Sequence, residues 1–525
     1  MVWNRFHLFL AVTYLAGLLL VGYLVGRTKR DSNQFLNASG ALPLWVCITA
    51  CIAANCGSLD VIAMMALGAQ YGMLACHFYW IGAVPALVVL AFWLLPAYAR
   101  GRYPTILDFI ARYYGQETRS VVALCISAMM LLLAGVCLCA VAQVLVAFLG
   151  WTFLQGILLT APVVLFYTWY GGLRATIYAE LLHFAVVLAA IVPLAFLVLH
   201  DFGGIRILLA SIPAGRFHAW QTLPYFAPQA TMDRFGLVVG LALVMSFGFW
   251  STDFVQMQRA LAVRRKKNVP YVPLAVAAAK LIFAFLIVLP GVVAPLVLHT
   301  RGTGNWNATM PSMMLHYYSP FWVVIGIMGL AASLVSTFAN NVAGFTSAWV
   351  QSIYRPWIRP GAGEAHYVWI SRMTNAAAVL LSIGAAYAAL SYQSLMEYIQ
   401  MVLSIFNAPL FALVALAALV PRRVVNGGLG GLTLGVTSTI LHQGMVRAGL
   451  LHYGSQMSAN FYAAILGFSI AAAGTLAISR IRGQRATRPT LGEAPVRLPL
   501  RFSLPTILLA TGIVGVCVVI NIVFW

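Results

Sequence analysis

The chain has 525 residues, of which 62% are hydrophobic and only 8% are charged. Such an apolar composition excludes a soluble globular domain and is typical of a polytopic membrane protein. The formal net charge of +20 would suggest a nucleic-acid partner in a soluble protein. Here the basic residues stand in short segments between apolar runs, so we expect a lipid bilayer around the protein and no nucleic-acid partner.

Hydropathy predicts about 14 transmembrane helices and therefore an all-α polytopic membrane protein. The predicted spans are 6–26, 43–70, 76–98, 119–149, 153–169, 175–200, 235–262, 270–298, 321–353, 368–392, 394–421, 428–448, 460–480 and 503–524. Lys and Arg recur in every second loop, beginning with 26–30, which places those loops in the cytoplasm. We therefore expect both termini on the extracytoplasmic side of a membrane, and a bacterial inner membrane as the location.

The second span is interrupted in its middle by the polar sequence Asn55-Cys56-Gly57-Ser58-Leu59-Asp60. Irregular backbone at this depth is tolerated only where it is buried in protein or lines a cavity, and an ionised carboxylate there must face inward. Secondary transporters bind ions and solutes at such interrupted helices. A Gly/Ser kink that serves close helix packing, with Asp60 neutral, is the alternative.

The spans also predict an internal repeat of two groups of five. The groups are 43–202 and 235–422, and each begins with an interrupted helix, the second near Ser246-Phe247-Gly248. An odd number of spans per group gives the two groups opposite orientations in the membrane, as in inverted-repeat transporters. The remaining segments are predicted to be a peripheral first span with its cytoplasmic loop at 1–42, an extracellular loop at 203–234 and three peripheral spans at 423–525.

A series of motifs in chain order resembles the solute:sodium symporter family, which includes the sodium/glucose, sodium/proline and sodium/pantothenate cotransporters. The motifs are Ala53-Ala54-Asn55 with Gly57-Ser58, Thr105-Ile106-Leu107-Asp108-Phe109, Gly171-Gly172-Leu173-Arg174-Ala175, Trp250-Ser251-Thr252-Asp253 with Gln258-Arg259, Pro290-Gly291 and Tyr398-Ile399-Gln400. The resemblance implies a LeuT-type 5+5 inverted repeat whose first and sixth core helices are broken.

The resemblance also implies a sodium site. In the family, backbone carbonyls of the first broken helix and hydroxyls of the eighth core span bind the ion. Carried across, these positions are Ala53 and Cys56 on the broken helix and Gly329 and Ser333 on the eighth core span. Ala332 stands where the family usually has a second hydroxyl, so one expected ligand is missing. The hydroxyls at 336–337, one turn away, are the alternative pair.

A proton is the alternative driving ion, because the predicted spans contain ionisable residues. Asp60, Glu180 and His183 lie in or near spans and are candidates for a proton relay. Glu180 and His183 also differ from the family's usual residues. For Glu180 the alternative is an ion pair with Arg174, and for His183 it is a packed side chain.

A solute pocket follows from the resemblance to the sugar transporters. Carried across, it comprises Asn55, Ser58, Asp60, Tyr79, Phe249, Trp250, Lys280 and Gln400. Tyr79 and Asp60 replace the acid and the histidine of the sugar members, which argues against a hexose. Lys280 is expected either to bind an anionic group of the solute or to pair with a carboxylate. Asp253 is expected to cap a helix or to pair with Arg259.

The sequence thus predicts a secondary active transporter that takes up a small polar organic solute by cation symport, with sodium as the expected ion. The alternatives are a proton-coupled or uncoupled transporter of the same fold, or a membrane sensor of a small solute. We find no HExxH motif, no carboxylate cluster and no phosphate-binding loop in the sequence, so we expect neither an enzyme nor an organic cofactor.

Overall fold

The computed structural model describes residues 42–96, 98, 103, 105–299, 305–420, 427–482 and 502–525, with only the backbone at 167, 170–179, 254, 255 and 258. The first predicted span, 6–26, lies outside these residues. Helices make up nearly all of the described chain. In addition, one isolated β-bridge pairs Leu42 with Val263. The bridge ties the start of the described chain to the loop that follows the second broken helix.

The first interrupted helix is confirmed at the predicted place. It consists of α3 (Leu44–Asn55) and α4 (Ser58–Tyr71). Cys56 and Gly57 between them leave the helical conformation, and Gly57 is extended at φ −76° and ψ −179°. Of the last carbonyls of α3, Ile52 O still accepts from the Cys56 N–H at 2.7 Å, whereas Ala53 O has no donor among the described backbone N–H groups outside the helices.

The second interrupted helix breaks later than predicted. Its parts are η4 (Gly236–Ser246), α11 (Phe247–Thr252) and α12 (Phe254–Leu261). The backbone only changes from π-helical to α-helical at 246–248, and it leaves the helix at Asp253, where ψ is 104°. The predicted position was wrong because Asp253 begins a new helix: its Oδ1 accepts a hydrogen bond from the Gln256 backbone N–H at 3.2 Å.

Short and long helices surround the two broken ones. Those before the second broken helix are η1 (Gly72–Cys76), η2 (Phe78–Ala83), α5 (Val84–Val89), η3 (Leu90–Leu94), α7 (Ile106–Leu149), α8 (Phe153–Asp201), α9 (Ile205–Ser211) and α10 (Ala214–Phe217). Those after it are η5 (Lys266–Asn268), α13 (Tyr271–Phe283), η6 (Ala284–Val288), α14 (Leu289–Val297), η7 (Trp306–Ala308), α15 (Thr309–Tyr317), α16 (Pro320–Trp349), η8 (Val350–Ile358), α17 (Glu364–Ala389), α18 (Leu395–Leu419), α19 (Gly428–Arg447), α20 (Gln456–Ile481) and α21 (Leu504–Val523).

Within the described residues, nine helices are long and apolar enough to cross a membrane, and four shorter apolar ones accompany them. The predicted spans 153–169 and 175–200 both lie in α8, which contains two separate apolar stretches at Phe153–Phe166 and Glu180–Asp201. Glycine lowers helix stability by about 1 kcal/mol relative to alanine. Gly171 and Gly172 therefore weaken this helix but do not end it.

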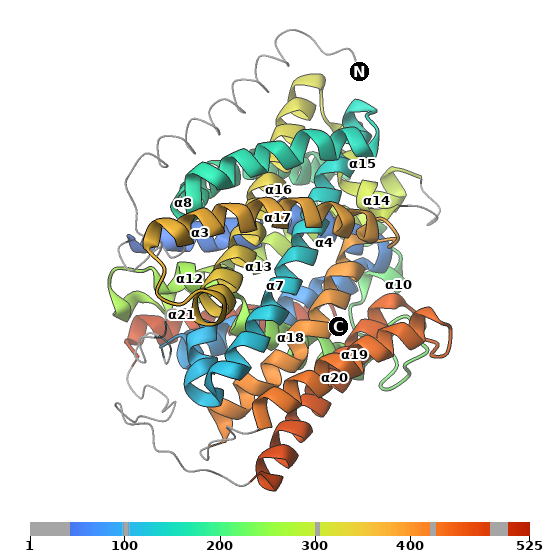
Figure 1. Cartoon of the computed structure of the whole chain (residues 1–525). Coiled ribbons are helices and arrows are strands. Elements are labelled where there is room, and N and C mark those ends of the chain that lie inside the picture. Colours follow the sequence, from blue (N-terminus) through green and yellow to red (C-terminus); the bar gives the residue numbers. More distant parts are fainter. Residues whose placement is uncertain are drawn as a thin grey trace.

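The broken helices pack against three long helices, α8, α16 and α18, and against the shorter α13 and α14. α4 packs against α14 and α16, α3 packs against α13 and α8, and α11 packs against α18. Figure 1 shows α18, α19 and α20 side by side, on the opposite side of the molecule from α8. The contact between α4 and α14 is especially close, because a Cβ atom at Gly291 would lie 2.4 Å from the Met65 carbonyl oxygen.

Candidate functional site

A cavity of about 220 Å³ lies between the two broken helices. Its walls also include residues of η2, α7, α13, α16 and α18. Seven of the eight predicted solute-binding residues line it, namely Asn55, Asp60, Tyr79, Phe249, Trp250, Lys280 and Gln400. Drug-sized ligands occupy pockets of about 300–1,000 Å³, so this cavity suits a smaller molecule.

Lys280 of α13 forms the charged centre of the cavity. Its Nζ atom donates to Asp60 Oδ2 at 2.9 Å and to the Asn55 carbonyl oxygen at 2.8 Å. The same Oδ2 atom accepts from the Tyr79 hydroxyl at 2.6 Å, and the ammonium lies 4.6 Å from the centre of the Tyr79 ring. Of the two predicted alternatives for Lys280, the structure shows pairing with a carboxylate.

Ser58, the eighth predicted solute-binding residue, is not among the described residues that line the cavity. It is fully buried against α16. Its backbone N–H donates to Ser333 Oγ at 2.9 Å, and its hydroxyl donates to the Gly329 carbonyl oxygen at 3.2 Å. Ser58 therefore joins the first broken helix to the predicted sodium site.

Oxygen atoms converge around Gly57, at the break in the first helix. A Cβ atom at Gly57 would lie 2.9 Å from Ser333 Oγ, 3.0 Å from the Ala53 carbonyl oxygen and 3.7 Å from Thr337 Oγ1. No described backbone N–H outside the helices donates to the carbonyls of Ala53 and Cys56. A neutral set of carbonyl and hydroxyl oxygens at a helix break fits a sodium ion.

The hydroxyls near Ser333 differ in their position relative to Gly57. Ala332 contributes only a methyl group. Of the alternative pair at 336–337, Thr337 lies beside Gly57, whereas Ser336 Oγ is buried and has no hydrogen-bond partner among the described residues. Thr337 is thus a further oxygen near the predicted site, one helical turn after Ser333.

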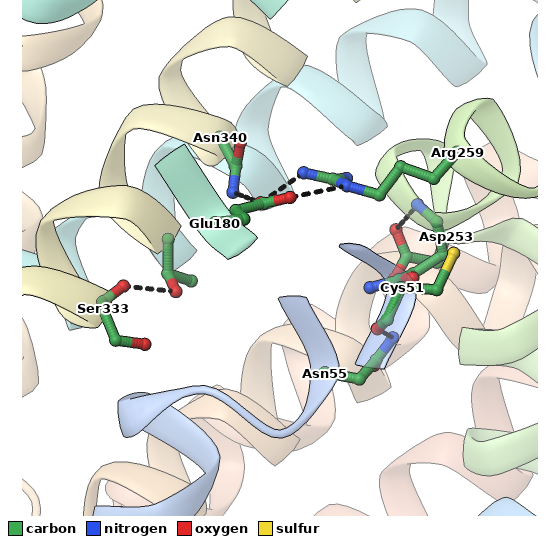
Figure 2. Close-up of polar contacts among 9 residues, drawn as sticks. Cys51, Asn55, Glu180, Asp253, Arg259, Ser333 and Asn340 are labelled. Atoms are coloured by element: carbon green, nitrogen blue, oxygen red, sulfur yellow. Dashed lines mark hydrogen bonds and ion pairs between the residues drawn. The ribbon is translucent and has the colours of Figure 1, made fainter. Parts of the chain in front are cut away.

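Glu180 of α8 is buried in an ion pair with Arg259 of α12. Arg259 Nε donates to Glu180 Oε2 at 3.1 Å, and Arg259 Nη2 donates to Glu180 Oε1 at 2.5 Å. Asn340 of α16 also donates to Oε1, so Glu180 lies between Asn340 and Arg259 (Figure 2). The partner of Glu180 is therefore Arg259, while the Arg174 side chain lies outside the described part of the chain.

His183 lies on α8, less than one turn after Glu180, and is buried. Neither residue is among those that line the cavity in the described chain. The relay role of Asp60, Glu180 and His183 stays a prediction. The Glu180–Arg259 pair joins α8 to α12 and lies next to the cavity, because Asn340 and Asp253 belong to the cavity wall.

Sequence reasoning missed part of the cavity wall. Asn340 and Asn341 of α16 line it, as do Met245 of η4 and Met396 of α18, and Thr337 lines it although the sequence suggested it only as an alternative sodium ligand. Two adjacent amides inside an apolar span were a usable signal, because polar residues in a membrane face the interior of the bundle. Methionines give no such signal, since they are common packing residues.

The eight cysteines are buried, single thiols. Within the described residues no group of three or more His, Cys, Asp or Glu side chains could hold a metal ion. The oxygen cluster at Gly57 is built differently, from backbone carbonyls and hydroxyls. It resembles the ion sites that discontinuous membrane helices form in transporters.

A helical membrane bundle whose two broken helices border one cavity defines the class of secondary active transporters. A family model described as "Sodium:solute symporter family" matches residues 35–435. The chain belongs to this family, which consists of transporters rather than enzymes. The predicted family resemblance is confirmed.

Curated relatives include the sodium/glucose cotransporter of Vibrio parahaemolyticus, which is 24% identical over 70% of this chain and 72% of its own length. Sodium/glucose cotransporter 1 of Mus musculus is 23% identical over 82% of this chain and 70% of its own length.

Two solved structures share the fold. A Na+-coupled sialic acid symporter in an outward-open state is 15% identical and superposes with a TM-score of 0.76 over 91% of this chain and 98% of its own. Mhp1, a nucleobase-cation-symport-1 family transporter, is 14% identical, with a TM-score of 0.52 over 88% of this chain and 97% of its own. The predicted all-helical, LeuT-type fold is confirmed by these similarities.

Proposed function

We propose that this chain takes up a small organic solute together with sodium, and that both bind between its two broken helices. The observation that carries the proposal is that both breaks border the same cavity. Asn55 and Gly57 contribute to its wall at the first break, and Asp253 and Gln256 contribute at the second. Solute and ion sites of inverted-repeat transporters lie at such paired breaks.

We infer that the solute contacts Asn55, Asp60, Tyr79, Phe249, Trp250, Lys280 and Gln400. The Gln400 amide lines the cavity and can donate and accept hydrogen bonds at once. Its buried Oε1 atom has no hydrogen-bond partner among the described residues. The Phe249 and Trp250 rings lie edge to face at 5.3 Å between centroids. These two large rings are suited to cover a bound solute and to exclude water.

We infer that sodium binds to the carbonyl oxygens of Ala53, Cys56 and Gly329 and to Ser333 Oγ. The support is the oxygen cluster around Gly57 and the sodium/glucose cotransporters among the relatives. A bound cation there would supply positive charge between the first broken helix and α16. Ser58 already bonds these two elements to each other, so ion binding and the position of the broken helix are expected to be linked.

The transmembrane arrangement is part of the proposal. We place both termini on the extracytoplasmic side of a bacterial inner membrane, because the basic residues gather in every second loop. The groups 43–202 and 235–422 would form the inverted repeat, with 1–42, 203–234 and 423–525 outside it. Transport would follow from rocking of one bundle against the other around the fixed site.

Charge movement in reconstituted proteoliposomes tests the proposal. Currents are recorded on a solid-supported membrane while sugars, amino acids, amines and organic acids are offered one at a time, with and without sodium. A current that needs both sodium and one solute supports the proposal. A current that does not depend on sodium but does depend on pH would indicate that the coupling ion is a proton. Binding of a solute without any flux would indicate a sensor.

A further inference from the structure

A second cavity, of about 870 Å³, is built from helix ends and connecting segments. Its described wall residues are Gln70, Tyr71, Thr231, Trp306, Ser391, Tyr392, Gln393, Glu397, Arg447, Gly454, Ser455 and Gln456. The proposed topology places all of them on the extracytoplasmic side, where α4, α17 and α19 end and α18 and α20 begin. This space is called the outer cavity below, and the cavity between the two broken helices is called the central cavity.

The outer and central cavities share helices but no described wall residue. On α4, Ala63 and Met64 line the central cavity. Gln70 and Tyr71 line the outer cavity, about 9 Å further along the helix axis at a rise of about 1.5 Å per residue. The residues between them, 65–69, are buried. Along α4 the protein is therefore closed between the two cavities.

The two cavities come close to each other again at the start of α18. Glu397 lines the outer cavity, whereas Ile399 and Gln400, less than one turn later, line the central one. The Oε1 atom of this glutamate accepts from Gln70 Nε2 at 3.1 Å and from the Tyr71 hydroxyl at 3.2 Å. Hydrogen bonds to an ionised carboxylate are roughly twice as strong as neutral ones. Two such bonds therefore join α18 to α4 at the boundary between the cavities.

A second element holds the same end of α4. Arg216 of α10 donates from Nη2 to the Gly68 carbonyl oxygen at 3.1 Å and to the Ala69 carbonyl oxygen at 2.6 Å. A cation is favourable at the C-terminal end of a helix, where carbonyls lack helical donors. A Cβ atom at Gly72 would lie 2.6 Å from the Arg216 carbonyl oxygen, so the backbones also touch. The residues 68–71 are thus bonded to two other segments of the chain.

Asn460 of α20 bonds to the backbone of Glu397. Its Nδ2 atom donates to the Glu397 carbonyl oxygen at 2.8 Å. Its Oδ1 atom accepts from Gln443 Nε2 of α19 at 3.0 Å and from Gln456 Nε2 at 3.2 Å, so the buried amide is fixed in orientation. Figure 1 shows α18, α19 and α20 side by side. The two helices α19 and α20, which lie outside the proposed inverted repeat, therefore determine where the first turn of α18 stands.

We propose that the contact of Glu397 with Gln70 and Tyr71 is the outer gate of the central cavity, and that Asn460 is a positioning residue through which α19 and α20 keep this gate closed. Opening breaks both hydrogen bonds to Glu397, separates the end of α4 from the start of α18 and joins the two cavities. The inference rests on the proposed function, because alternating access requires a barrier on each side of the binding site. It gives the helices outside the repeat a part in that barrier.

Labelling of a cysteine inside the central cavity tests the gate. Ser246→Cys supplies the probe, because Ser246 lines the central cavity and is half-buried, and a thiol in place of the hydroxyl changes its shape little. The eight native cysteines are buried, and the native chain measures their background. A membrane-impermeant methanethiosulfonate reagent is applied to right-side-out and to inverted membrane vesicles without solute, and the labelling rate is measured from each face.

Two variants in the Ser246→Cys chain should open the gate. Glu397→Leu removes both hydrogen bonds to α4, and we expect labelling from the extracytoplasmic face to become at least about tenfold faster, equivalent to about 1.4 kcal/mol. Asn460→Ala removes only the bond that positions Glu397, and we expect a smaller increase on the same face. The rate from the cytoplasmic face should not rise in either variant, because labelling follows the population of the outward-open state.

Matched controls separate the gate from a general loss of structure. Glu397→Gln keeps an acceptor oxygen at the same place and should label at a rate near that of the native gate. Thr475→Val is the control for Asn460→Ala, because Thr475 is buried on the same helix and its hydroxyl donates to a carbonyl of that helix. If Glu397→Leu does not fold, Tyr71→Phe removes one of the two bonds and should raise the rate in the same direction.

The outcomes also separate this inference from the proposed function. A rate that is unchanged in Glu397→Leu and Tyr71→Phe, or that rises equally from both faces, overturns the gate. A faster rate in Glu397→Leu with an unchanged rate in Asn460→Ala overturns the positioning role of Asn460. Labelling requires neither sodium nor transport. Faster labelling in a protein that carries no sodium-dependent current would therefore uphold the gate and overturn the proposed function, and sodium-dependent currents with unchanged labelling would do the reverse.

Discussion

Lys280 Nζ lies 2.9 Å from Asp60 Oδ2, and the same nitrogen lies 2.8 Å from the Asn55 carbonyl oxygen. The first contact is an ion pair, and the second occupies a carbonyl that the helix break has released. One side chain of α13 therefore holds both sides of the break between α3 and α4. We expect this contact to set the stability of the broken helix as well as the charge of the cavity.

Removing one partner of this pair should be more harmful than removing both. Lys280→Met leaves Asp60 without its counter-charge, and breaking a buried pair typically costs about 3–5 kcal/mol. Because Asp60 is 19% exposed to the cavity, we expect the lower end of this range. Thermal unfolding of Lys280→Met and of the double variant with Asp60→Asn measures the difference. Equal stability of the two variants would show that an unpaired Asp60 carries no cost.

The oxygen cluster at Gly57 predicts which hydroxyls matter for sodium. Ser333→Ala removes one proposed ligand, and we expect sodium activation of solute currents to require about tenfold more sodium, equivalent to about 1.4 kcal/mol. Ser336→Ala is the matched control, because Ser336 Oγ is buried and has no partner among the described residues. An unchanged sodium dependence in Ser333→Ala would place the ion elsewhere.

The same cluster predicts a smaller effect for Thr337→Val. This substitution keeps the shape of the side chain and removes the hydroxyl, whose Oγ1 would lie 3.7 Å from a Cβ atom at Gly57. We expect the apparent affinity for sodium to be lower than in the native chain. The reduction should be smaller than in Ser333→Ala. Sodium titrations of the three proteins at fixed solute concentration provide the comparison, and a larger loss in Thr337→Val would reverse the assignment.

The close contact of α4 with α14 predicts a strong effect of a single methyl group. Gly291→Ala would place Cβ 2.4 Å from the Met65 carbonyl oxygen, and overpacking of this kind costs about 1–3 kcal/mol. Gly384→Ala on α17 is the control, since nothing lies within 4 Å of its Cβ position. There the greater helix propensity of alanine should raise stability slightly. Thermal unfolding of both variants tests the contact, and equal melting temperatures would contradict it.

A polar contact between α4 and α18 predicts a further stability effect. Glu397 of α18 accepts from Gln70 Nε2 at 3.1 Å and from the Tyr71 hydroxyl at 3.2 Å, at the end of α4. Tyr71→Phe removes one hydrogen bond to a charged group, worth about 1.5–3 kcal/mol. Tyr225→Phe, at a side chain that is 79% exposed, is the control. A melting temperature that falls equally in both variants would exclude a role for the Glu397 contact.

The sequence by itself determined the membrane class and the first of the two breaks. Apolar runs long enough to cross a bilayer can only be helices there, because every backbone group must find its partner within the segment. The interruption at 55–60 could be predicted because polar residues and glycine stand together in an apolar run. The second interruption was placed too early, since Gly248 stays helical and Asp253 caps the next helix.

Only the tertiary structure decided which distant side chains meet. Lys280 and Asp60 are 220 positions apart, and Arg259 and Glu180 are 79 apart. Thr337, and not Ser336, lies near Gly57 because of the face that α16 turns toward the first broken helix. Hydropathy and spacing report on one helix at a time, whereas these contacts follow from how the helices pack against one another, and so no local pattern in the chain encodes them.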